Sequence, residues 1–252
     1  MKKFKKLLSF LMVFFMGLTL AVGCNDDDGA GCDGDMTLEQ LNEMLNDSEN
    51  MNMDLANAVA IIPFNHINGP RNEWKFYALV NFQFKERNYV KYQVTYLSCT
   101  CRAANVNYWQ TAYVELSLTT KAENAKLRTL SFDKDAEDHY IAGFWGDSSP
   151  IYSESDGHLV ATYEKMSDGN GGYYPSIKHD FIPLLVGKTK AQIDSYNVMD
   201  DMESSGVMTE DMFDSFTGAS VSTNNILRIL HALFKHHTAT YYDAEGNLKT
   251  SN

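Results

Sequence analysis

A short stretch near the C-terminal end of the chain places a hydroxyl group, small residues and a helix start close together. It runs from Asp214 to Ser220 and includes Thr217, Gly218 and Ala219. Small residues form a turn that another molecule can approach closely. Apolar residues at helical spacing follow this turn, namely Ile226, Leu227, Ile229, Leu230 and Leu233. The first turn of such a helix offers free N–H groups and the positive end of its dipole, which suit a phosphate.

A purely structural interpretation of the same stretch is an ordinary loop followed by a capped helix. Ser222 or Thr223 can cap that helix, because short hydroxyl side chains accept hydrogen bonds from the first free N–H groups. On the physics of the residues alone, this interpretation explains the stretch without any ligand.

A family resemblance favours the ligand-binding interpretation. The pattern Asp214-x-x-Thr217-Gly218-Ala219-Ser220 resembles the flavinylation motif of FMN-binding domains, Asp-x-x-Ser/Thr-Gly-Ala-Thr/Ser. Such domains occur in sodium-pumping quinone reductases, in related Rnf-type complexes and in lipid-anchored flavoproteins of extracellular electron transfer. In that family, a flavin transferase joins FMN by a phosphoester bond to the hydroxyl of the last motif residue. That residue corresponds to Ser220 here, although the family more often has threonine at this position.

The resemblance also implies roles for the other motif residues. Thr217 is a neighbouring hydroxyl, and with Gly218 it would shape the turn around the phosphate. Asp214 would help the transferase recognise the motif or would fix the turn, and Ala219 would complete the set of cofactor-binding residues. The covalently bound FMN would perform the redox chemistry. The motif therefore predicts neither a catalytic side chain nor a metal ligand in this chain.

The N-terminal segment predicts export and lipid anchoring. Residues 1–23 combine a basic start with a short apolar run, which is typical of a secretory signal. The residues before Cys24 resemble the bacterial lipobox, in which the cysteine becomes lipid-modified and is the first mature residue. Residues 24–36 are acidic and rich in glycine, which indicates a flexible tether. We therefore expect a lipoprotein at the extracellular face of the cell membrane.

The charge of the chain excludes nucleic-acid binding as a function. The full sequence has a formal net charge of −12. Removal of residues 1–23, which contain four lysines and no acidic residue, makes this charge −16. Such a chain repels nucleic acid and anionic lipid headgroups through its overall field.

The remaining cysteines leave their redox state open. With Cys24 lipidated, the other three are Cys32, Cys99 and Cys101, an odd number that cannot pair completely within the chain. The last two are separated by one residue, and no nearby histidine completes a metal site. We expect small residues on one face of a strand, or a disulfide from one of them to Cys32.

Alternating apolar residues predict a twisted antiparallel sheet, and with the helices an α+β fold that is FMN-binding-domain-like. The expected strands lie at about 59–64, 74–84, 89–96, 113–119 and 127–132. Residues 85–88 are predicted as a hairpin turn, and residues 123–126 as a second turn. In the fourth strand, Val114, Leu116 and Leu118 are expected to point inward.

The helices are predicted around this sheet. A short helix is expected after Thr37, which forms a capping-box pattern with Gln40, and Leu38, Leu41 and Leu45 are expected to share one face. A second helix is expected from about Thr189. A flexible acidic loop would then lead to the motif, and the last helix would run to about His237. We expect one FMN-binding-like domain at residues 37–237 and a C-terminal tail at 238–252 that is a small hairpin or disordered.

Other residues that could perform chemistry are weaker candidates. Aromatic side chains that could stack on a flavin ring are Trp109, Phe144, Trp145, Tyr173 and Tyr174, although most aromatic residues of a sheet protein belong to its core. The histidines of the last helix, His231, His236 and His237, lack metal-ligand spacing. Asp138 and His139 lack a nucleophile signal. Residues 168–172 lack the distal glutamate of a calcium loop.

The leading functional hypothesis is a lipid-anchored extracellular flavoprotein that carries covalent FMN. It would take electrons from membrane quinone or NADH dehydrogenase components and pass them to extracellular acceptors, as an electron carrier more than as an enzyme with its own substrate. Its partners would include a flavin transferase. The alternative is a cofactor-free surface binding or adhesion lipoprotein, and a third, weaker hypothesis is an exported hydrolase.

Overall fold

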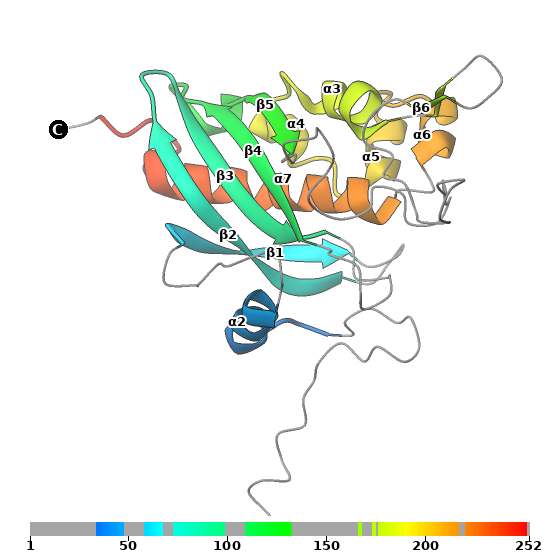
Figure 1. The fold of residues 1–252 in the computed structure, drawn as a ribbon. Coiled ribbons are helices and arrows are strands. Elements are labelled where there is room, and N and C mark those ends of the chain that lie inside the picture. Colours follow the sequence, from blue (N-terminus) through cyan, green and yellow to red (C-terminus); the bar gives the residue numbers. More distant parts are fainter. Residues whose placement is uncertain are drawn as a thin grey trace, which may run out of the picture.

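The fold consists of an antiparallel sheet crossed by one long helix, as Figure 1 shows. The computed structural model describes residues 34–47, 58–67, 73–98, 109–132, 166–167, 173–174, 176–216 and 220–250. Five strands lie side by side in chain order: β1 (Ala60–Ile67), β2 (Glu73–Lys85), β3 (Tyr89–Leu97), β4 (Trp109–Ser117) and β5 (Leu127–Phe132). Two short strands, β6 (Met166–Ser167) and β7 (Tyr173–Tyr174), pair separately. The predicted antiparallel sheet with helices is confirmed.

The strand pattern follows the alternation of the sequence. In β1, Ile62 and Phe64 are buried, while Pro63 between them is exposed. β1 is an edge strand, where a proline does not interrupt the pairing of neighbouring strands. The predicted hairpin between β2 and β3 is confirmed, and in β4 Val114 and Leu116 are buried as expected.

One irregularity in β2 reverses the direction of its last side chains. Val80 pairs with Val94, but Phe82 pairs with Gln93, so Asn81 is an additional residue in β2. Such a β-bulge shifts the two-residue alternation by one position. After it, Gln83 points toward the long helix, where its Nε2 lies 2.7 Å from the hydroxyl oxygen of Tyr241.

The helices are short except for the last. They are α2 (Leu38–Asp47), η2 (Ala122–Asn124), η3 (Ile177–Phe181), α3 (Ile182–Leu185), α4 (Lys190–Ile193), α5 (Met199–Ser204), α6 (Glu210–Phe216) and α7 (Ser220–Tyr241). The capping box of Thr37 and Gln40 is confirmed, with its two hydrogen bonds at 2.7 Å and 3.1 Å. The start of the helix predicted from Thr189 is confirmed by α4, which has a capping box of its own but ends after one turn, at Ile193.

Two expectations about the helices were wrong. The predicted flexible acidic loop before the motif contains α5 and α6, because Met199, Met202 and Phe216 bury their side chains in the core. Each of these two helices has acidic residues in its first turn, where they interact favourably with the positive end of the helix dipole. In α2, Leu41 is fully buried but Leu38 is 46% exposed, so the two do not share a buried face.

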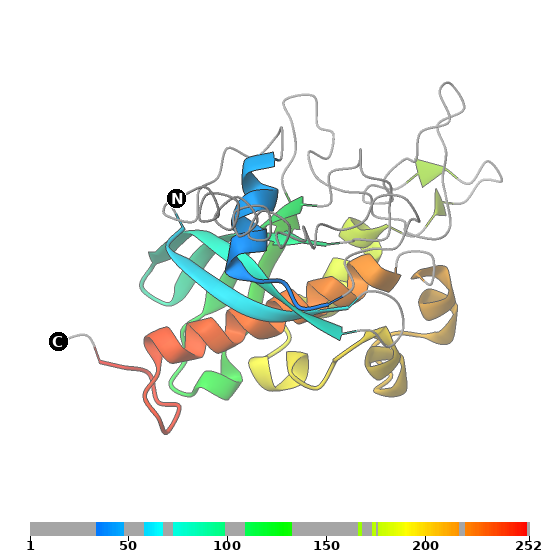
Figure 2. The same cartoon turned by 90° about the horizontal axis from the view of Figure 1, so that it is seen from below.

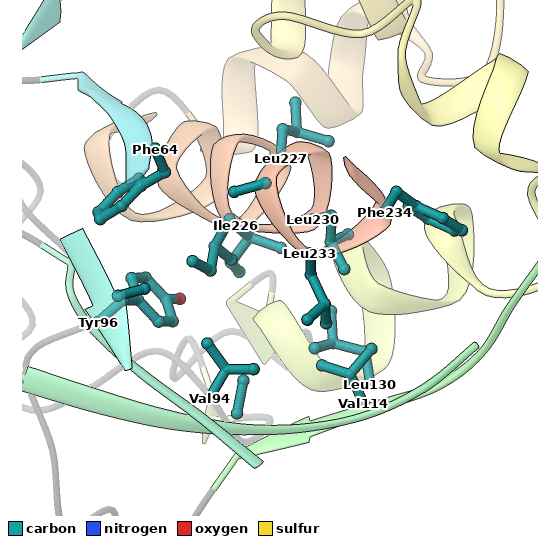
Figure 3. Close-up of a cluster of buried hydrophobic side chains, with 14 of the residues drawn as sticks. Phe64, Val94, Tyr96, Val114, Leu130, Ile226, Leu227, Leu230, Leu233 and Phe234 are labelled. Atoms are coloured by element: carbon teal, nitrogen blue, oxygen red, sulfur yellow. The ribbon is translucent and has the colours of Figure 1, made fainter. Parts of the chain in front are cut away.

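The core lies between α7 and the sheet. Figure 3 shows side chains of α7 above those of the strands, which include Phe64, Val94, Tyr96, Val114 and Leu130. All five apolar residues predicted to form the helix face, Ile226, Leu227, Ile229, Leu230 and Leu233, are buried. In Figures 1 and 2, α2 lies on the opposite side of β1 from α7. The two faces of the sheet therefore meet different helices.

The C-terminal end of the molecule is ordered beyond the predicted helix end. α7 continues past His237 to Tyr241. The rings of His236 and His237 contact the ring of Tyr92 edge-on. The tail then turns back, so that Tyr242 pairs with Leu248 and Lys121 with Asn247. Of the two possibilities expected for the tail, the hairpin is observed. Among the described residues, no helix has the length and apolar content needed to cross a membrane.

Candidate functional site

The candidate site is the start of α7, where the motif ends. Ser220 is the first residue of this 22-residue helix and is half-buried. Asp214 lies in α6 and is exposed. Thr217, Gly218 and Ala219 lie outside the described residues. The structure thus places Ser220 in the first turn of a helix, whereas the sequence predicted it in the turn before that helix.

The chain is fixed on both sides of residues 217–219. Phe216, the last residue of α6, is 2% exposed, and its ring lies 5.6 Å from that of Phe181 in an edge-to-face contact. On the other side, Val221 is also buried. Ser220 is therefore not part of a free tail but begins a packed helix.

The predicted capping role of Ser222 and Thr223 is wrong. Both residues lie inside α7 and are fully buried, because the helix already begins at Ser220. The Thr223 hydroxyl donates to the carbonyl oxygen of Ser220 at 3.2 Å and lies 2.9 Å from the sulfur of Met199. It thus ties the first turn of α7 to the start of α5.

Asn224 strengthens this connection between α7 and α5. Its Oδ1 accepts a hydrogen bond from the backbone N–H of Met199 at 2.9 Å. That N–H belongs to the first residue of α5 and has no partner within its own helix. A side chain of α7 therefore satisfies the N-terminus of a second helix.

Asn225 joins α7 to the ends of two strands. Its Oδ1 accepts from the N–H of Ile67 at 2.9 Å, and its Nδ2 donates to the carbonyl oxygen of Ile67 at 2.9 Å. Nδ2 also donates to the carbonyl oxygen of Ser98 at 2.6 Å. The side-chain amide of Asn225 thus makes with Ile67 the two hydrogen bonds that a neighbouring strand would make. This contact lies beside the start of α7.

His66 completes this buried polar cluster. Its Nε2 donates to the same Ser98 carbonyl oxygen at 2.9 Å, which leaves Nδ1 unprotonated and without a described partner. The ring stacks on Phe76 with the centroids 4.4 Å apart. Burial lowers the pKa of His66 to about 4, because the charged form would lose its hydration. The side chain is therefore neutral near pH 7.

Arg228 links the third turn of the helix to the start of β2. It is 7% exposed, and its Nε donates to the carbonyl oxygen of Asn197 at 2.8 Å. Its guanidinium also pairs with the carboxylate of Glu73 at the start of β2. Because the guanidinium has partners on both sides, its burial is compensated. Together with Asn224 and Asn225, it holds the first three turns of α7 against the sheet and α5.

The N-terminus of α7 differs electrostatically from those of α5 and α6. α5 and α6 have acidic residues in their first turns, and Asp201 of α5 accepts from the N–H groups of Asn197 and Val198. The first turn of α7 contains no acidic residue. No carboxylate of α7 itself would therefore compete with a bound anion at this helix N-terminus. The positive end of the helix dipole favours an anion there.

The histidines of α7 have structural partners. His231 donates from Nε2 to the carbonyl oxygen of Ile193 at 2.8 Å, and His236 donates to Oε1 of Gln83 at 2.7 Å. His237 accepts at Nδ1 from the Tyr92 hydroxyl at 2.8 Å and contacts the Ser117 carbonyl oxygen through Nε2 at 3.3 Å. In the part of the chain that the structure describes, no three His, Cys, Asp or Glu residues are grouped to hold a metal ion.

The structure does not assemble the other candidates into one site. Trp109 is 4% exposed and belongs to the core, so it does not present its ring to a flavin. The backbones of Tyr173 and Tyr174 form β7, but their side chains are outside the description. The remaining candidates lie outside the described residues: Cys24, Cys32, Cys99, Cys101, Asp138, His139, Phe144, Trp145 and residues 168–172.

Comparison with known proteins gives this chain no relative. No family model, no curated protein and no solved structure matches it. The functional argument therefore depends on the residues of the chain and on their arrangement.

The polar cluster below Ser220 was missed in the sequence analysis, although the sequence contained signals for it. His66 follows Ile62 and Phe64 at two-residue spacing, which places it on the buried face of β1. Two consecutive asparagines are unusual inside a helix because their side chains compete with backbone hydrogen bonds. A polar run at the start of a buried helix therefore indicates either caps or specific buried partners.

Proposed function

We propose that this protein is a lipid-anchored extracellular flavoprotein that carries FMN on Ser220 and transfers electrons from the membrane to extracellular acceptors. The flavin would be attached by a separate transferase through a phosphoester to the Ser220 hydroxyl. An FMN-binding-domain-like fold is part of this proposal. It is supported by the antiparallel sheet with packed helices and by the flavinylation-like motif.

The observation that carries the proposal is the position of Ser220. The last motif residue is the first residue of a long helix whose first turn has no acidic residue. A phosphate on this hydroxyl would lie at the positive end of the helix dipole. Ser220 is partly exposed, as attachment by a transferase requires, and the buried side chains of Asn224, Asn225 and Arg228 hold the start of α7 in place.

We expect Ser220→Ala to remove covalent flavin completely and to leave the fold intact. The substitution deletes the only atom of that residue that can form the ester. It keeps the backbone carbonyl oxygen that accepts the hydrogen bond of the Thr223 hydroxyl. The measurement is intact mass and visible absorbance of the protein co-expressed with a flavin transferase. Wild type should be yellow and carry the mass of one FMN less one water.

Thr217→Ala is the companion variant, because it removes the other hydroxyl of the motif. It should lower the yield of the adduct, since Thr217 would shape the turn around the phosphate, but the adduct that forms should map to Ser220. Retention of the adduct in Ser220→Ala and its loss in Thr217→Ala would move the attachment site to Thr217. A colourless wild type of unmodified mass, where a control substrate of the transferase is labelled, would favour the cofactor-free surface binding lipoprotein.

A further inference from the structure

The β2–β3 hairpin exposes two aromatic rings on the face of the sheet that points away from α7. Phe82 and Phe84 are 46% and 51% exposed, and their rings are nearly parallel, with the centroids 6.3 Å apart. Without the bulge at Asn81, the alternation of β2 would continue from the buried Val80 and would place both rings on the α7 side. Exposure of this aromatic pair is therefore built into the strand.

The same end of the molecule has an excess of positive charge. In the β2–β3 hairpin and in the segment from β4 to β5, six basic residues stand against three acidic ones: Lys85, Arg87, Lys91, Lys121, Lys126 and Arg128 against Glu86, Glu115 and Glu123. Two ion pairs, Lys91 with Glu86 at 3.4 Å and Arg128 with Glu115 at 3.9 Å, neutralise only part of this charge. The last turns of α7 and the C-terminal hairpin are balanced, with two basic and two acidic residues: Lys235, Lys249, Asp243 and Glu245. We call this part of the molecule the basic end.

The opposite end of α7 is acidic. α5, α6 and the turn between them contain six acidic residues and no basic one: Asp200, Asp201, Glu203, Glu210, Asp211 and Asp214. Figures 1 and 2 show these helices near the start of α7, whereas the β2–β3 hairpin lies near its end. There, Nε2 of Gln83 donates to the Tyr241 hydroxyl oxygen at 2.7 Å. Because the 22 residues of α7 measure about 33 Å, the two charged ends are well separated.

We propose that the basic end docks on an anionic lipid bilayer, with Phe82 and Phe84 among the lipid headgroups. Aromatic rings favour the boundary between headgroups and acyl chains, and basic side chains are attracted to anionic headgroups. This attraction acts within a Debye length of about 8–10 Å. The acidic residues of α5 and α6 lie farther from the lipid than this length. The net charge of −12 therefore does not prevent docking of this end.

The proposed lipid anchor would bring the chain to a bilayer, and the docking rests on the proposed function in this respect. The chain enters the fold at β2, where the N–H of Lys75 donates to Oδ1 of Asp35 at 2.7 Å and its carbonyl oxygen accepts from the N–H of Met36 at 2.8 Å. From Lys75 to Phe84, β2 spans about 30 Å. The ten residues 24–33 reach at most about 35 Å. The hairpin is thus within reach of the bilayer that would hold the anchor.

Docking by the basic end would fix the orientation of the flavin. A lipid anchor alone leaves the protein free to rotate above the bilayer, whereas a second contact does not. With the β2–β3 hairpin at the lipid, the acidic end and Ser220 turn away from it. An FMN on Ser220 would then face the extracellular acceptors.

Vesicle co-sedimentation of the mature chain with Cys24→Ser tests the docking. This chain carries no acyl chain and keeps every described element, so its binding depends on the protein surface alone. It should bind phosphatidylglycerol vesicles at low salt, release them at about 0.5 M salt, and not bind phosphatidylcholine vesicles. Phe82→Ser combined with Phe84→Ser should weaken binding at least about tenfold. The matched control is Leu38→Ser combined with Val59→Ser, which changes residues of similar exposure, 46% and 58%, and should bind like wild type.

A charge reversal provides a second test that does not depend on the aromatic rings. Arg87→Glu should weaken binding to phosphatidylglycerol at least about fivefold, because Arg87 is exposed in the hairpin turn. Lys75→Glu makes the same change of charge at an exposed position near the other end of β2. It should change the affinity by less than about twofold.

Two tryptophan reporters test the orientation. Phe84→Trp places a fluorophore in the hairpin, and Ser204→Trp places one at the exposed end of α5. Brominated phosphatidylglycerol should quench the first strongly and the second hardly, each measured against the tryptophan fluorescence of the parent chain.

Three results would overturn the proposal: no binding to phosphatidylglycerol vesicles at low salt, equal losses in Arg87→Glu and Lys75→Glu, or equal quenching of the two reporters. These measurements use neither acyl chains nor flavin. A protein without covalent FMN that still binds through the hairpin would therefore keep the docking and remove the electron-transfer function.

Discussion

Asn225→Leu should lower the free energy of unfolding by about 3–5 kcal/mol, the largest effect that we expect from a single substitution in this protein. Leucine has a similar size, so the change removes hydrogen bonds without leaving a large cavity. The N–H and the carbonyl oxygen of Ile67 would both lose their side-chain partner. The Ser98 carbonyl oxygen would keep His66 as its donor. Two unpaired buried backbone groups cost about 1–3 kcal/mol each.

Urea unfolding followed by circular dichroism measures this effect, and Asn224→Leu is the matched control. Asn224 is the neighbouring asparagine and has a similarly low exposure, but its side chain is seen to satisfy one backbone group, the N–H of Met199. The control should therefore cost only about 1–2 kcal/mol. An equal free energy of unfolding in the two variants would show that the hydrogen bonds of Asn225 to the strand ends contribute less than we expect.

The stability of the protein should fall steeply when the pH decreases from about 6.5 to about 4. Burial lowers the pKa of both His66 and His237 to about 4 in the folded protein. In the unfolded chain a histidine has a pKa of about 6.5, so the unfolded state binds more protons in this range. The favourable contribution is fully present above pH 6.5 and is lost as the pH falls through the folded pKa. Each histidine contributes on the order of 3 kcal/mol.

The hydrogen bonds of the two rings explain why protonation is unfavourable. Nδ1 of His237 accepts a hydrogen bond from the Tyr92 hydroxyl, and protonation of this nitrogen would remove that acceptor. Nδ1 of His66 has no described partner, so a proton there would be buried and unpaired. The two sites lie at opposite ends of α7, and the two effects should therefore be nearly additive.

Urea unfolding at several pH values between 7 and 4 measures this dependence. His66→Phe and His237→Phe should each flatten the curve, although both variants are less stable than wild type at pH 7. A residual slope should remain, because burial also lowers the pKa of His231 and of His236. His179→Gln changes an exposed histidine and serves as the control for the removal of an imidazole. Equal slopes in wild type and in the two phenylalanine variants would contradict the assignment to His66 and His237.

Local patterns of the sequence predicted much of this fold. The alternation in β4 placed Val114 and Leu116 in the core, and the spacing in α7 placed Ile226 and Leu230 there. The capping box of Thr37 and Gln40 marked the start of one helix. These signals lie within a few residues of the feature that they predict, so no knowledge of the tertiary structure is needed to use them.

Features that depend on distant contacts were not predicted. Phe82 and Phe84 have the pattern of buried strand residues, and only the pairing of β2 with β3 reveals that a bulge turns them outward. The bonds of Asn225 reach Ile67, which is 158 residues away in the chain. The segment before the motif has an acidic sequence typical of a loop, yet Met199 and Met202 anchor it as helix. Flavin attachment at Ser220 stays a prediction.

The way in which β1 ends has a consequence for the solubility of the protein. β1 is the first strand of the sheet, and an open edge strand can recruit a strand of another molecule and so start aggregation. Pro63 has no N–H to offer to such a strand. At the end of β1, Asn225 occupies both the N–H and the carbonyl oxygen of Ile67. The side chain that fastens α7 thus also protects this edge against uncontrolled addition of further strands.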